Sequence, residues 1–325
     1  AAPLLNIDGK NYSVGNNLDE LGRAVYLSIE RQQWLHAKDY LKRYTALSDH
    51  DPMLTAYANG ALARADGDLE LAEQYYRQLL TMQSDFLPGR LELARVLFEN
   101  RKDRDSTSVF QQISTSLSPS DTQAMGLGKT VDSFLQALDR REDWQGSFAI
   151  GPIWSDNLNQ SSESSVTYRI ETNQGTYVIT RSLPKAVSAH GVDYEGTLNK
   201  RVAISGHHGA FVRSLLYGQS YDEQSKYNEG TLINNAGYSY HDARNQYSIG
   251  PSFEFNTMGS VAMYSAWGLH GEWMRKLSAT RMFKLEGDYK DMVYKHDINS
   301  NLDGATNSVS ATLFQVLPRQ STLFG

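Results

Sequence analysis

The segment Met263–Trp273 reads MYSAWGLHGEW, and apolar and polar side chains alternate along it. Trp267 and Leu269 share one face of an extended chain, because residues two apart in a β-strand point the same way. His270 and Glu272 share the opposite face. Strands of soluble proteins average only about five or six residues. A longer alternation with one charged face and aromatic side chains near its ends is typical of a transmembrane β-barrel.

The segment Phe283–Lys290 (FKLEGDYK) repeats this pattern, with Lys, Glu, Asp and Lys in succession on its polar face. Tracing the alternation outward predicts that residues 144–325 form an antiparallel transmembrane β-barrel. The expected strands lie near 146–156, 188–200, 202–218, 227–242, 245–257, 260–277, 281–295 and 306–317. Short turns are expected at Asn199-Lys200, Ala243-Arg244 and Met258-Gly259, opposite the longer connections 219–226 and 296–305. The long connection 157–187 is expected to contain a small hairpin, 166–171 with 176–182.

The polar faces of these strands supply the predicted lumen residues. They are Glu254, His270, Glu272, Lys284, Glu286, Asp288 and Lys290. Most are expected to form cross-strand ion pairs, and a minority to line a path through the barrel. The adjacent His207 and His208 would point to opposite faces of a strand, so we predict no metal site and no catalytic residue.

Both ends of the chain carry expectations of their own. Residues 321–325 read as the beginning of a further strand, and lipid cannot accommodate an unpaired sheet edge. We therefore expect the chain to be part of a longer protein. The start, Ala1-Ala2-Pro3-Leu4-Leu5, has neither Met nor a basic region and reads as the end left by signal-peptide cleavage.

Residues 18–143 have helical periodicity instead, after an N-terminal segment 1–17. Similar residues recur 34 positions apart: Gly60 and Ala94, Ala72 and Ser106, Tyr76 and Phe110. The stretch from Met53 to Phe86 resembles a tetratricopeptide (TPR) repeat, a pair of antiparallel helices. Three units are predicted, at about 18–51, 53–86 and 87–118, followed by a capping helix near 121–141.

Stacked TPR units bind partners on the concave face formed by the first helix of each pair. In the predicted register this face carries Tyr26, Tyr57, Arg64, Arg95 and Phe98. Two alternatives stay open. Tyr57 and Phe98 would equally suit packing between units, and the two arginines would equally suit a solvated surface.

Composition excludes several classes of protein. The 325 residues carry 31 basic and 37 acidic side chains, a net charge of −6, which argues against nucleic-acid binding. There are no cysteines, so disulfide frameworks and thiolate metal sites are excluded. No apolar run approaches the roughly 18–20 residues of a membrane-spanning helix.

The combination of these parts resembles one family. Its features are the TPR-like units, the junction from Trp144 to Gly151 (WQGSFAIG), the entry Asp156-Asn157-Leu158-Asn159 and the barrel strands that follow. They are similar to the surface lipoprotein assembly modulators (Slam), the outer-membrane proteins of type XI secretion. The resemblance implies a two-domain α + β chain in the outer membrane of a Gram-negative bacterium, with the TPR domain in the periplasm. The implied partners are a client lipoprotein or small secreted protein, a periplasmic chaperone and outer-membrane lipid, with no cofactor.

Three other functions remain as alternatives. Polysaccharide-export porins also join TPR units to a barrel, although their arrays are usually longer. A host-interaction outer-membrane protein would fit the same architecture. A barrel enzyme is the third, but His270 and Glu272 have no recognisable nucleophile spaced with them, so the chain is not expected to be an enzyme.

Overall fold

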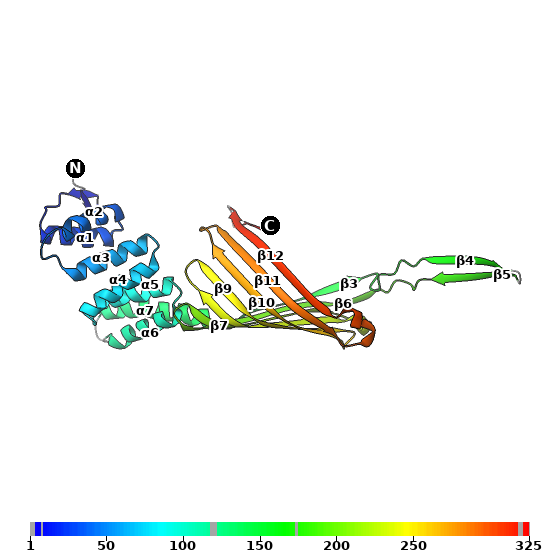
Figure 1. Cartoon of the computed structure of the whole chain (residues 1–325). Helices are drawn as coiled ribbons and strands as arrows, with labels where there is room; N and C mark the ends of the chain where they lie inside the picture. The colour runs from blue at the N-terminus through cyan, green and yellow to red at the C-terminus, as the bar shows by residue number, and fades with distance from the viewer. Residues whose placement is uncertain (1–3, 8, 118–121, 173–174, 318–320, 325) are drawn as a thin grey trace. The chain divides into compact units, whose positions relative to one another are not determined.

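A computed structural model describes residues 4–7, 9–117, 122–172, 175–317 and 321–324 (Figure 1). The expectations that concern Ala1–Pro3, Asp121 and Gly325 lie outside the described residues. The chain divides into two units. The first comprises residues 1–142 with the short segments 202–209 and 240–245, and the second comprises the remainder. No described helix is both long enough and apolar enough to cross a membrane.

Seven helices make up most of the first unit. They are α1 (Leu18–Glu30), α2 (Trp34–Thr45), α3 (Pro52–Ala65), α4 (Leu69–Met82), α5 (Leu87–Glu99), α6 (Asp103–Ser116) and α7 (Thr122–Glu142). Each predicted repeat contains one helix pair, and α7 follows as the expected final helix. Several helices begin at a capping residue, since Asn17, Asp51 and Asp68 each accept a backbone N–H of the first turn.

The repeated small and large residues explain why the helices pair closely. A Cβ atom on Gly60 would lie only 2.8 Å from the ring of Tyr76, so the glycine makes room for the tyrosine of the next helix. Tyr76 and Phe110, one repeat apart, are fully buried. Gly67 adopts φ +83°, the left-handed conformation required in the α3–α4 turn.

A small N-terminal hairpin precedes the helices and was not expected from the sequence. Its strands are β1 (Leu5–Ile7) and β2 (Lys10–Tyr12). Leu5 is buried with the core of α1 and α2, and the side chain of Gln33 donates a hydrogen bond to the carbonyl of Asn6 at 2.8 Å. These contacts attach the hairpin to the first repeat.

The second unit contains most of a nine-stranded sheet in the order β13-β12-β11-β10-β9-β8-β7-β6-β3. Its strands are β3 (Gln145–Ser155), β6 (Ala189–Ser205), β7 (His208–Tyr221), β8 (Glu229–His241), β9 (Asn245–Met258), β10 (Val261–Lys276), β11 (Arg281–Tyr294), β12 (Gly304–Leu317) and β13 (Ser321–Phe324). The pairs β3–β6, β10–β11, β11–β12 and β12–β13 are antiparallel. The predicted hairpin is also present, as β4 (Ser165–Thr172) and β5 (Gly175–Ser182).

One predicted turn was wrong. The chain does not reverse at Asn199-Lys200, because β6 continues to Ser205 and the turn comes at Gly206-His207. The alternation persists through this region, with Val202 and Ile204 exposed and Ala203 buried between them. Gly206 has φ +53°, which suits a tight reversal.

Short turns were expected at one end of the sheet and long connections at the other, and this holds only in part. Successive antiparallel strands place the turn at Ala243-Arg244 at one end of the sheet. The turn at Gly259-Ser260 lies at the other end, together with the long connections 156–188, 222–228 and 295–303. Both residues of this turn adopt positive φ, +60° and +65°, so a two-residue reversal suffices there.

Candidate functional site

The two faces of the sheet differ in a way opposite to that of a soluble protein. The outer face, which carries Trp267 and Leu269, exposes large apolar side chains, and Trp267 is 65% exposed. The inner face, which carries His270 and Glu272, buries polar ones. Among the described strand residues its buried polar side chains include Thr231, Asn235, Ser248, Glu254, Asn256 and Glu272. A wall that separates an apolar medium from a polar interior has this arrangement.

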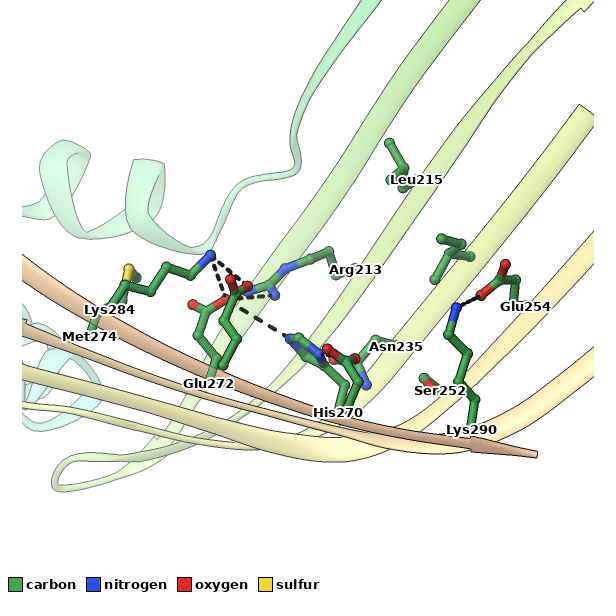
Figure 2. Close-up of a pocket in the computed structure, with 13 residues that line it drawn as sticks. Arg213, Leu215, Asn235, Ser252, Glu254, His270, Glu272, Met274, Lys284 and Lys290 are labelled. Carbon is green, nitrogen blue, oxygen red and sulfur yellow. Dashed lines mark hydrogen bonds and ion pairs between the residues drawn. The ribbon is translucent and has the colours of Figure 1, made fainter. Parts of the chain in front are cut away.

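All seven predicted lumen residues lie around one cavity of about 530 Å³ on the inner face (Figure 2). The register of β10 and β11 explains why they meet, since His270 pairs with Asp288 and Glu272 with Glu286. Six further residues also line the cavity: Arg213, Leu215, Ile233, Asn235, Ser252 and Met274.

One end of the cavity contains a cluster around Glu254. The ammonium of Lys290 lies 2.6 Å from the Glu254 carboxylate, and the hydroxyl of Tyr264 donates to the same side chain at 2.7 Å. Lys290 belongs to β11 and Glu254 to β9, so this ion pair passes over β10. Charge and hydrogen bonding of this buried carboxylate are therefore both satisfied.

A second cluster surrounds Glu272, whose side chain is nearly inaccessible to solvent. Its Oε2 atom lies 3.3 Å from Lys284 Nζ and 3.5 Å from Arg213 Nη1. Lys284 also contacts Glu286 at 2.7 Å. The Glu272 carboxylate thus joins residues of three strands.

His270 lies on β10 beside the Glu272 cluster. Its Nδ1 atom lies 2.7 Å from Asp288, and its Nε2 atom 4.0 Å from Glu272. His270, Glu272 and Glu286 could bring ligand atoms within 4.8 Å of one another around a metal ion. However, Lys284 already contacts both glutamates, so a metal ion would have to displace its ammonium. The absence of a metal site stays a prediction.

The helical unit has a second candidate site, an aromatic groove. The rings of Tyr26 and Tyr57 stack with centroids 6.4 Å apart, and Tyr57 meets Tyr76 edge-on at 6.2 Å. A pocket of about 450 Å³ adjoins them, lined by Tyr26, Asp51, Met53, Leu54, Tyr57, Gln83, Phe86 and Pro88. Burial raises the pKa of Tyr57 to about 12, so its hydroxyl stays protonated and can donate.

The predicted arginines of this concave face are paired with acidic residues. Arg64 contacts Glu99 at 2.5 Å and lies 3.9 Å from Glu92, while Arg95 contacts Glu92 at 3.0 Å. The hydrogen bond with Glu99 raises the pKa of the Arg64 guanidinium. A partner would therefore meet a balanced ionic surface here and not two unpaired cations.

Phe98 lies apart from the aromatic groove. Its ring packs edge-on against Phe134 of α7 at 5.0 Å, and the guanidinium of Arg141 lies 3.7 Å above it. The geometry of Phe98 matches the packing alternative, whereas Tyr26 remains 44% exposed and open to a partner.

A polar cluster in the first unit centres on Glu70, which the sequence did not single out. Its carboxylate contacts Lys102 at 2.9 Å, His207 at 2.8 Å and Asn100 at 2.7 Å. Burial opposes ionisation, but the hydrogen bonds from these three side chains outweigh it and lower the pKa of Glu70 to about 2.

Sequence reasoning also missed residues that complete the two candidate sites. Arg213 lies in the largely apolar stretch FVRSLLY, where a single charge gives little indication of its face. Asn235 follows a second asparagine, Asn234, on the opposite face of the strand, so alternation does not distinguish it. Met53 and Phe86 of the aromatic groove lie near helix ends, where periodicity is weakest.

Comparison with known proteins agrees with this two-part architecture. The surface lipoprotein assembly modifier family matches residues 144–325, and the N-terminal TPR repeats of the same family match residues 8–110. The chain is 43% identical to the hemophilin secretion modulator of Acinetobacter baumannii, over 99% of this chain and 66% of that protein. It is 28% identical to surface lipoprotein assembly modifier 2 of Haemophilus influenzae, over 86% of this chain and 56% of the relative.

A third relative is surface lipoprotein assembly modifier 1 of Neisseria meningitidis, 26% identical over 80% of this chain and 49% of its own length. The chain thus spans about half to two thirds of these relatives. No solved structure matches it. The match over most of both parts, with 43% identity to one relative, shows that the chain belongs to the surface lipoprotein assembly modifier family.

Proposed function

We propose that this chain is the helical domain and part of the barrel of an outer-membrane translocator. It would move a client lipoprotein or small secreted protein to the bacterial surface. The observation that carries the proposal is the sheet, whose apolar outer face and buried polar inner face suit a wall between lipid and a wet path.

The names of the relatives support the class of client. One relative is named for secretion of hemophilin, and others are named for assembly of surface lipoproteins. Within the proposal, the outer face contacts outer-membrane lipid, and the helical unit lies in the periplasm. We assign the chain no cofactor and no catalytic step, because movement of a protein forms and breaks no covalent bond.

The aromatic groove is the proposed client-binding surface. Exposed Tyr26 and half-buried Tyr57 offer flat rings with polar hydroxyls, a combination that is enriched at protein interfaces. A periplasmic chaperone that delivers the client would use the same face.

Surface exposure of a client tests this function directly. The full-length protein would be expressed with the lipoprotein or small secreted protein encoded beside it, and intact cells labelled with antibody against that neighbour. Labelling is expected to require the full-length protein and to disappear when residues 18–141 are deleted. Equal labelling of cells without the protein would contradict the translocator and would favour polysaccharide export or a direct role at the host surface.

A pair of tyrosine substitutions separates an effect on client binding at the groove from an effect on the stability of the protein. Tyr26 is 44% exposed and Tyr12, outside the groove, is 47% exposed. Tyr26→Ser is expected to lower client exposure severalfold, as loss of about 1–2 kcal/mol at an aromatic contact would. Tyr12→Ser is the matched control and should leave it unchanged. Equal effects of the two substitutions would remove the groove from the proposal.

A further inference from the structure

The ion pair between Arg213 and Glu272 connects strands that are not neighbours. Arg213 lies on β7 and Glu272 on β10, and the sheet order places β8 and β9 between them. Four adjacent strands of a flat sheet would hold the outer two backbones roughly 14 Å apart. The two side chains therefore extend over the inner face of β8 and β9, and Figure 2 shows the contact between them. We call this contact the Arg213–Glu272 bridge. Its side chains fill space on the inner face that would otherwise belong to the cavity.

Glu272 does not depend on Arg213 for charge compensation. Lys284 lies 3.3 Å from the same carboxylate oxygen and belongs to β11, the neighbouring strand. Removing the last partner of a buried carboxylate is strongly destabilising. Here the carboxylate keeps its ammonium partner if the arginine leaves, so the cost of opening the bridge is limited.

Arg213 also has an acceptor beside it on β8. Ser214 donates to Asn234 at 2.6 Å, which indicates that these two residues face each other across β7 and β8. Antiparallel pairing then places Arg213 and Asn235 side by side on the inner face. Both residues line the cavity.

Asn235 has an unused acceptor in this arrangement. Its Nδ2 atom donates to the carbonyls of Gly250 and Pro251, at 3.0 and 2.8 Å. Its buried Oδ1 atom accepts no hydrogen bond from the described residues. A buried acceptor without a donor is costly, and a guanidinium withdrawn from Glu272 would satisfy it.

We propose that Arg213 has two positions that control the width of the inner path. In the bridged position it contacts Glu272 and narrows the path, and in the withdrawn position it donates to Asn235 and lets a client segment pass. Glu272 keeps a cationic partner in each position, because Lys284 stays with it, and the withdrawn guanidinium of Arg213 is partly exposed to water. This inference rests on the proposed translocator function.

Ion conductance of the purified full-length protein in a planar lipid bilayer tests the bridge without any client. The bridge can be removed from either side, by Arg213→Met or by Glu272→Gln. Each substitution is expected to raise the open conductance at least about twofold. Arg213→Lys keeps a cation and should stay near the wild-type value. Lys276→Met, at the exposed end of β10, is the control for loss of one positive charge. A heat-induced shift in gel mobility would verify that each variant is folded.

Asn235→Leu tests the withdrawn position. It removes the acceptor, so client exposure on intact cells is expected to fall at least about threefold while conductance does not rise. Conductance equal to wild type for both Arg213→Met and Glu272→Gln would overturn the proposal. The same holds if Asn235→Leu leaves client exposure unchanged. If the client reaches the surface without the protein, the translocator function fails instead, and that result is independent of the bilayer measurement.

Discussion

The helical repeats and the sheet bury opposite kinds of side chain within one chain. In the helices the fully buried positions include Leu21, Tyr76 and Phe110. In the sheet, Glu254 and Glu272 are buried while Trp267 stands exposed. In the helices burial therefore selects apolar side chains, whereas on the inner face of the sheet it selects polar ones.

This difference identifies where each part gains its stability. Folding the helices removes apolar area from water, worth about 25 cal/mol per Å². The sheet leaves such area on its outer face, so the same gain comes only when that face enters an apolar medium. Its inner face relies on satisfied hydrogen bonds and ion pairs, such as Lys290 with Glu254.

Truncating one phenylalanine in each part should produce the largest contrast. Phe110→Ala removes a fully buried ring of the helical core and is expected to cost about 3–5 kcal/mol of unfolding free energy. Phe253→Ala removes an outer-face ring whose main contact is Trp267, with centroids 4.7 Å apart, and should cost about 0.5–1.5 kcal/mol. Urea unfolding of the full-length protein in detergent, followed by circular dichroism, measures both. Equal costs would mean that the outer face is an ordinary packed core.

The second-largest contrast should come from replacing an exposed leucine by arginine, on the outer face of the sheet and on the surface of the helices. Leu269→Arg, on the outer face, is expected to cost about 2–4 kcal/mol if it lies near the middle of a bilayer. Leu35→Arg, on α2 and 84% exposed, should change the unfolding free energy by less than about 0.5 kcal/mol. The fraction of folded protein in lipid vesicles, read from gel mobility, reports the first, and helix melting reports the second. Tolerance of arginine at both positions would argue against a lipid-facing sheet.

Much of the fold followed from local pattern. Alternation located β10 and β11 and the polar partners His270 and Glu272, because strand geometry alone decides which face a residue takes. The 34-residue spacing located the helix pairs, since Gly60 and Tyr76 must meet wherever such helices pack.

Other features depend on contacts that no local pattern contains. The β6–β7 turn was misplaced by several residues, because Asn199 and Lys200 resemble turn residues although the strand continues past them. Arg213 joined the inner cluster only through a side-chain contact that reaches from β7 past β8 and β9 to β10. Likewise, the repeat register predicted Phe98 on the concave face. Its ring is instead covered by α7, a helix that lies outside the repeats.

The smallest expected effect concerns acid and the polar cluster at Glu70. The pKa of Glu70, about 2, lies below its ordinary value of 4.5, so the stability that this carboxylate contributes is present above about pH 4.5 and is lost as the pH falls towards 2. Because the side chain is 55% exposed, solvent screening keeps the contribution below about 1 kcal/mol. Hydrogen exchange of α4 amides in the full-length protein, compared between wild type and Glu70→Gln, isolates it. The two profiles should differ at pH 5 and converge near pH 2. Asp66→Asn, which breaks an exposed ion pair with Lys38, serves as the control. If the difference between wild type and Glu70→Gln stays constant from pH 5 to pH 2, ionisation of Glu70 does not stabilise the helical unit.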